Sequence, residues 1–135
     1  MKDINKLYCI TLFIDIFIIT CLYIISFNLF DLLWIYLVLF SHVLFYYGLY
    51  INNKLILDFI HYFIFILPSL SLFCNHISLK IISLLLIIII QVLWIKYNKC
   101  ILNEKVGEFG YDNELNYYLI TLTCLLSLQI GYLLK

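Results

Sequence analysis

The chain has 135 residues, of which 66% are hydrophobic and only 12% are charged, and its eight lysines balance eight acidic residues. Soluble globular domains are about 45–50% apolar and about 25% charged, so this composition excludes an ordinary soluble domain and predicts a polytopic membrane protein. The sequence has no arginine and no basic excess, which excludes nucleic acid as a partner.

The residue usage also indicates the kind of genome that encodes the chain. Isoleucine, phenylalanine, tyrosine, asparagine and lysine, whose codons are rich in A and T, are abundant, whereas alanine and arginine are absent. This bias predicts an AT-rich genome, viral or organellar or that of an AT-biased microbe. The missing alanine therefore reflects codon usage and carries no functional meaning.

Five stretches are long and apolar enough to be predicted as membrane spans, since a helix needs roughly 20 apolar residues to cross a bilayer. They cover residues of about 7–25, 32–51, 55–73, 77–97 and 115–134. Short turns join the first four, so neighbouring spans must run antiparallel. We predict one domain, 1–135, with an all-α fold: an integral membrane up-down helix bundle of about five transmembrane helices, with a polar inner loop at 98–114.

The breaks between these stretches carry turn chemistry. Asp31 is placed to cap the second helix, and Asn52 and Asn53 form a short turn before the third. The third stretch is the weakest span, because it contains Asp58, His61 and Pro68. A kinked or re-entrant third segment, and hence four spans, is the alternative.

The lysines predict the orientation, because basic residues are retained on the cytoplasmic side. Five spans place most of the lysines on one side, leaving only Lys80 and Lys135 on the other. The N-terminus is therefore expected inside, in the cytoplasm or matrix, and the C-terminus outside. The side with most lysines holds Lys2, Lys6, Lys54, Lys96, Lys99 and Lys105.

Polar side chains within the spans are the candidate functional residues. An ionisable group at the bilayer centre costs at least about 2.5–3.5 kcal/mol when it is charged and faces lipid, so such groups are expected to face the bundle. Counted at 1.5 Å per residue, four of them share one depth in the inner half, and Asp58 lies about one turn nearer the inner surface. This intramembrane polar layer comprises Asp15, His42, Asp58, His61 and Gln91.

Three interpretations of the layer remain open. The first is interhelical hydrogen bonding in a structural or accessory membrane protein, which contacts lipid and other membrane subunits or its own copies. The second is a proton or ion path through the Asp and His side chains. The third is a haem or metal site with His42 and His61 as ligands. No HExxH or Cys-x-x-Cys motif supports this third interpretation, so no cofactor and no catalytic residue is predicted, and a non-enzymatic role is favoured.

One segment carries a resemblance to a known group of proteins. Trp94, Asn98, Cys100, Leu102 and Glu104 lie where the fourth span ends and the inner loop begins. This pattern resembles a segment of small multispanning membrane proteins of giant DNA viruses, which are functionally uncharacterised. The resemblance implies a membrane location and assigns no activity.

Overall fold

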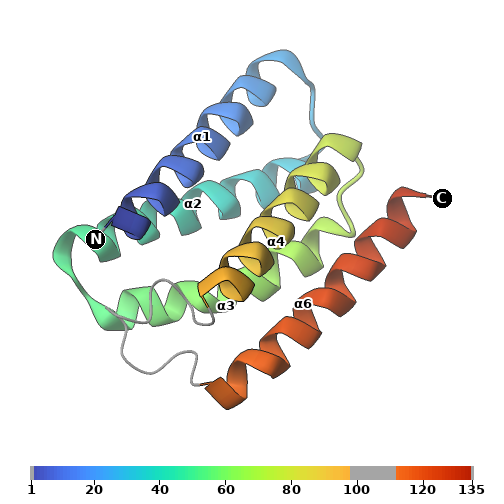
Figure 1. The fold of residues 1–135 in the computed structure, drawn as a ribbon. Coiled ribbons are helices and arrows are strands. Elements are labelled where there is room, and N and C mark those ends of the chain that lie inside the picture. Colours follow the sequence, from blue (N-terminus) through green and yellow to red (C-terminus); the bar gives the residue numbers. More distant parts are fainter. Residues whose placement is uncertain (1, 98–111, 135) are drawn as a thin grey trace.

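The computed structural model describes residues 2–97 and 112–134, and all regular secondary structure within these ranges is helical. The helices are α1 (Lys2–Ile24), α2 (Leu29–Ile51), α3 (Lys54–Ser71), α4 (Ile77–Tyr97) and α6 (Asp112–Leu133) (Figure 1). The predicted all-α class is therefore confirmed. Residues 98–111, which include most of the predicted inner loop and of the segment that resembles viral proteins, lie outside the described residues.

Two of the helices are long and apolar enough to cross a membrane, Leu29–Ile51 and Ile77–Lys96. Three further helical stretches are apolar but shorter: Tyr8–Ile24, Leu55–Ser71 and Ile120–Leu133. Length and composition thus indicate a membrane association through α2 and α4.

The start of α2 differs from the sequence prediction. Asn28, in extended backbone conformation, is the N-cap, and its side chain accepts a hydrogen bond of 2.7 Å from the backbone N–H of Asp31. The prediction that Asp31 caps this helix was wrong, because the helix begins at Leu29 and includes Asp31 in its first turn. The Asp31 carboxylate is thereby released for a contact elsewhere in the bundle.

Two adjacent asparagines make the tight turn between α2 and α3. Asn52 closes α2 in the left-handed conformation, with φ of 52°, which asparagine tolerates better than most residues. Asn53 then caps α3, since its side chain accepts a hydrogen bond from the backbone N–H of Ile56. The turn brings the two helices so close that a Cβ atom at Gly48 would lie 3.0 Å from Leu57. Glycine at this position therefore fits the close packing of α2 on α3, which form the most extensive helix–helix interface among the described residues.

Successive helices run antiparallel, and α1 and α6 lie at opposite edges of the bundle (Figure 1). Helix α1 packs on α2, whereas α6 packs mainly on α4 and also contacts α3. At the end of the bundle that holds the α1–α2 and α3–α4 turns, the rings of Phe27 and His76 meet edge to face at 5.2 Å. This end is called the outer end below, after the predicted orientation, and the opposite end is called the inner end.

The buried core has two parts along the bundle axis. The part near the outer end centres on Trp34, whose indole N–H donates a hydrogen bond of 2.8 Å to the carbonyl of Leu67. The part near the inner end centres on Phe45, Leu57 and Trp94. Both parts consist of large side chains in contact, which is how a bundle without alanine can pack.

Large apolar side chains also cover the outside of the helices. The hydrophobic residues are distributed around α1, α2, α4 and α6 and do not form a single apolar stripe, which is the pattern of helices surrounded by apolar material. Among the most exposed are Phe13, Tyr23, Ile24, Leu29, Tyr50, Leu55, Phe73, Ile95 and Leu134.

Candidate functional site

Three side chains of α1 and α2 form a hydrogen-bonded group, called here the α1–α2 polar cluster. The Asp15 Oδ1 atom lies 2.6 Å from His42 Nδ1, and the Tyr46 hydroxyl donates a hydrogen bond of 2.7 Å to Asp15 Oδ2. His42 and Tyr46 are four residues apart, so they lie on the same face of α2 and can hold one carboxylate between them. The sequence placed Asp15 and His42 at one depth, and the structure brings them into contact.

The surroundings of the cluster decide its charge. The side chains of His42 and Asp15 are only 14% and 13% exposed, so a net charge on the pair is costly. Two arrangements carry no net charge: a carboxyl group that donates to a neutral Nδ1, and an ion pair in which Nδ1–H donates to the carboxylate. In both arrangements the other ring nitrogen, Nε2, carries a hydrogen.

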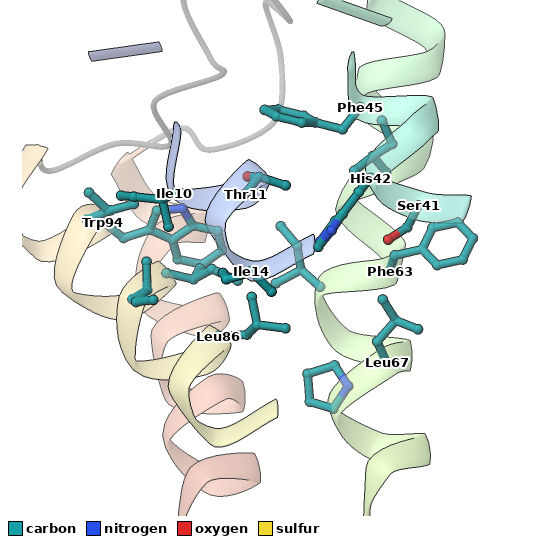
Figure 2. Close-up of a pocket in the computed structure, with 16 residues that line it drawn as sticks. Ile10, Thr11, Ile14, Ser41, His42, Phe45, Phe63, Leu67, Leu86 and Trp94 are labelled. Carbon is teal, nitrogen blue, oxygen red and sulfur yellow. The ribbon is translucent and has the colours of Figure 1, made fainter. Parts of the chain in front are cut away.

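A cavity of about 150 Å³ lies beside this cluster, between α1, α2, α3 and α4. Its walls are mostly aliphatic and aromatic, with polar groups contributed by Thr11, Ser41 and His42 on one side. Figure 2 shows the His42 ring directed from α2 towards Ile14 of α1, and the side chains of Trp94 and Leu86 facing it across the cavity. The hydroxyl group of Ser41 donates to the carbonyl of Val38 in its own helix, so its hydrogen is already used.

The His42 imidazole is therefore bound on one edge and open on the other. Its Nδ1 is held by Asp15, whereas no hydrogen bond from the described part of the chain reaches its Nε2. A carboxylate that holds one ring nitrogen fixes the orientation of the other, as in many histidines that bind ligands or metals. The site thus presents one oriented N–H group at the wall of an apolar cavity.

The other members of the predicted polar layer take separate positions. His61 is buried and its Nδ1 lies 2.9 Å from the carbonyl oxygen of Leu57 in the same helix. Gln91 donates a hydrogen bond of 3.1 Å to the Thr123 hydroxyl and so joins α4 to α6. The Oδ1 atom of Asp58 is buried and has no hydrogen-bond partner among the described residues. Residues predicted at a similar depth therefore need not be in contact: Asp15 and His42 are, whereas Gln91 binds elsewhere.

A second polar group is almost completely buried, lies near the outer end and joins three helices. In this α3–α4–α6 polar cluster, the Gln129 amide nitrogen contacts the Pro68 carbonyl oxygen at 3.0 Å, the Ser71 hydroxyl at 2.6 Å and the Ser83 hydroxyl at 2.8 Å. The two serine hydroxyls lie 2.9 Å apart. Because a carbonyl can only accept, the contact with Pro68 identifies the amide nitrogen as the atom that faces the serines.

Asp31 forms a further contact at the outer end. Its side chain is 2% exposed, and its Oδ1 accepts a hydrogen bond of 2.8 Å from the backbone N–H of Asn75, in the turn between α3 and α4. The neighbouring Cys74 is buried in this turn as a free thiol. Burial, with the nearby Asp31 carboxylate, raises the pKa of the Cys74 thiol to about 12. This thiol is therefore protonated at physiological pH and acts as a hydrogen-bond donor to Asp31.

Sequence reasoning missed several of these contacts. Tyr46 was not among the predicted polar residues, yet its hydroxyl donates a hydrogen bond to Asp15. The spacing of four between His42 and Tyr46 was the available signal, because both side chains then face α1. No comparable signal joins Ser71, Ser83 and Gln129, which are far apart in sequence and meet only through the packing of three helices.

Among residues 2–97 and 112–134, no group of three or more His, Cys, Asp and Glu side chains is placed to hold a metal ion. His42 and His61, the ligands in the third interpretation of the polar layer, contact different partners: His42 binds Asp15 of α1, and His61 lies near the Leu57 carbonyl of its own helix. No protein-family model, curated protein or solved structure matches this chain.

Proposed function

We propose that the chain is a multi-pass membrane protein with a structural or accessory role, acting through lipid and through neighbouring membrane subunits or copies of itself. The proposal includes five spans, with the N-terminus inside and the C-terminus outside. In this arrangement the bundle itself is the functional unit.

One observation carries the proposal: buried polar side chains pair across helices, while large apolar side chains cover the outside. The α1–α2 and α3–α4–α6 polar clusters join neighbouring helices through side-chain hydrogen bonds. Polar groups that hydrogen-bond across helices stabilise bundles in lipid, where hydrophobic association between helices is absent. The outward-facing phenylalanine, leucine and isoleucine side chains fit a lipid environment or the apolar face of another subunit.

Purification from native membranes under mild detergent tests this role. We expect the chain to remain in the membrane fraction after alkaline carbonate washing and to co-purify with defined membrane proteins, or as a defined oligomer, identified by mass spectrometry. A matched sample solubilised in a denaturing detergent controls for non-specific capture. Extraction of the chain by carbonate, or recovery as a lone monomer, would contradict the proposal.

Proton conduction is the second candidate, and the position of the cavity favours it. His42 of the α1–α2 polar cluster lines one part of the cavity, and Pro68, whose carbonyl belongs to the α3–α4–α6 polar cluster, lines another. Water in this space would link the two clusters along the bundle axis. The mostly apolar lining opposes this, because apolar cavities of this size tend to stay dry.

Proton flux in liposomes distinguishes the two candidates. If the chain conducts protons through this path, Asp15→Asn removes most of the flux, since the carboxylate that binds His42 is lost. Gln91→Leu, which changes a polar residue outside both clusters, is the matched control and is expected to leave the flux unchanged. A reconstituted protein with no flux above that of empty liposomes excludes conduction and leaves the structural role.

A further inference from the structure

We propose that the cavity between α1, α2, α3 and α4 is a binding site for a small lipophilic carbonyl compound, such as an aromatic ketone or a quinone, whose oxygen accepts a hydrogen bond from His42 Nε2. This goes beyond a structural role, because it assigns a ligand class to the bundle. Three features of the cavity lead to it: its volume, its lining and the oriented N–H donor of His42 in its wall.

The volume sets the size of the ligand. An apolar cavity of about 150 Å³ accepts a ligand of the size of benzene, and this cavity has that volume. Its lining comes from four helices, and aromatic side chains such as Phe45, Phe63 and Trp94 are available to contact a flat ring. A compact body of one ring with a short substituent therefore matches the space.

The lining of the cavity also determines how polar the ligand can be. Most of the cavity wall consists of isoleucine, leucine and aromatic side chains, which favour an apolar body. Among the polar lining groups, the Ser41 hydroxyl already donates to the carbonyl of Val38. The ligand accordingly needs few polar atoms, and His42 is the most suitable partner for a carbonyl oxygen.

The hydrogen on His42 Nε2 determines which kind of polar atom the ligand needs. Both uncharged arrangements of the Asp15–His42 pair place a hydrogen on Nε2, so the ring donates and the ligand must accept. A carbonyl oxygen is a strong acceptor that carries no donor of its own, and it does not add a charge to the cavity. An alcohol can accept too, but its hydroxyl hydrogen would then need a second partner in an apolar wall.

The route of entry lies between α1 and α4. Helix α1 packs chiefly on α2, so it borders the cavity without extensive packing against α4 (Figure 1). The residues that border the cavity on these two helices, Ile10, Ile14, Ile89 and Leu93, are apolar. A lipophilic molecule dissolved in the surrounding apolar phase can enter sideways here without crossing a polar surface.

Binding of two isosteric probes to the purified full chain tests the proposal. Acetophenone has a carbonyl oxygen where α-methylstyrene has a methylene group. We expect acetophenone to quench Trp94 fluorescence saturably and α-methylstyrene to displace it with about three- to tenfold weaker affinity. The infrared carbonyl band of bound acetophenone is expected at lower frequency than in detergent alone, as a hydrogen-bonded carbonyl requires.

Three variants locate the site. Ile14→Phe fills the cavity and leaves the Asp15–His42 contact in place, so it is expected to abolish saturable binding. Ile16→Phe adds the same volume at an exposed position of α1 and is the matched control, with binding unchanged. His42→Leu is expected to equalise the two probes and to remove the shifted carbonyl band. Circular dichroism and gel filtration of each variant separate loss of binding from loss of fold.

The outcomes that overturn the proposal are distinct. Equal affinities of the two probes for the wild-type chain would show that no donor acts on the ligand. Saturable binding that survives Ile14→Phe would place the ligand elsewhere, and the absence of saturable binding would show that the cavity is not a site for this class. None of these results bears on the membrane topology, so a failure here is distinguishable from a failure of the structural role.

Discussion

The two polar clusters of the bundle differ in how completely they are enclosed. The α3–α4–α6 polar cluster joins three helices, and the side chains of Ser71, Ser83 and Gln129 are at most 2% exposed. The α1–α2 polar cluster joins two helices, is partly exposed and borders a cavity. Buried polar groups in one small bundle thus differ in accessibility: one cluster is enclosed by three helices, whereas the other leaves the Nε2 edge of His42 at the wall of a cavity.

The two clusters differ in enclosure because α6 and α1 pack differently on the rest of the bundle. Helix α6 packs on α4 and α3, so Gln129 reaches between two helices that are already in contact. Helix α1 packs chiefly on α2, so Asp15 can be satisfied by His42 and Tyr46 of that helix alone. The side of the cluster facing α4 is left without protein, and the cavity occupies it.

Replacement of Gln129 is expected to have the largest effect on stability. Gln129→Ala removes contacts to two serines and a carbonyl and opens a void, so we expect the free energy of unfolding to fall by about 2–3 kcal/mol. Titration with a denaturing detergent in mixed micelles measures this value. Gln91→Ala, which removes a more exposed bond to Thr123 between α4 and α6, is the matched control, at about 0.5 kcal/mol. Equal losses for both would refute the distinction between closed and open positions.

Replacement of Asp31 is expected to have the second largest effect on stability. Asp31→Ala leaves the backbone N–H of Asn75 without its acceptor in a buried turn, at a cost of about 2 kcal/mol. Asp31→Asn keeps an acceptor oxygen at this position and is expected to cost about 1 kcal/mol or less. The same detergent titration compares the two. A loss as large for Asp31→Asn as for Asp31→Ala would show that the charge matters and the hydrogen bond does not.

A smaller and more local effect is expected at Asp15. Asp15→Leu separates α1 from His42 and Tyr46, and we expect a loss of about 1 kcal/mol. Amide hydrogen exchange should become faster along α1 and stay unchanged in α6, because α1 packs chiefly on α2. Faster exchange throughout the bundle would mean that the α1–α2 polar cluster supports the whole fold, contrary to the comparison above.

The smallest expected effect concerns the chemical reactivity of the Cys74 thiol. Its pKa is raised from 9.0 to about 12, so the folded state disfavours the thiolate, and this contribution to stability is complete below about pH 9 and is lost as the pH rises towards 12. Between pH 8 and pH 10, iodoacetamide should therefore modify the exposed Cys9 and leave Cys74 unmodified. Mass spectrometry of the digested protein measures both sites. Modification of Cys74 at the same rate as Cys9 would contradict its buried, protonated state.

Much of the fold could be predicted from the sequence, because composition and turn residues act locally. The Asn52–Asn53 turn and the apolar stretches gave helix ends close to those observed, although Asn28 and not Asp31 caps α2. The shared depth of Asp15 and His42 was a prediction from the sequence, whereas their contact is seen only in the structure. Helix order and residue depth could be predicted because the short turns left little freedom in the topology.

The rest depended on rotation about each helix axis, which depth does not determine. His61 and Gln91 have depths similar to that of His42 but contact other groups. His61 Nδ1 lies near the Leu57 carbonyl of its own helix, and the Gln91 amide donates to Thr123 of α6. The α3–α4–α6 polar cluster could not be predicted either, because serine and glutamine are common on helix surfaces. Only the packing of α6 against α3 and α4 shows that Gln129 is enclosed.

Side-specific labelling of α3 tests the central proposal, a five-span bundle, most directly, because α3 is the shortest of the described helices and contains Asp58, His61 and Pro68. Tyr50→Cys and Asn75→Cys each place a thiol at an exposed position near one end of this helix. Each is made in a chain whose Cys9, Cys100 and Cys124 are serine, and sealed vesicles are treated with a membrane-impermeant maleimide. The account predicts labelling of the two thiols from opposite sides of the membrane, with Tyr50→Cys on the inner side. Labelling of both from the same side would contradict it.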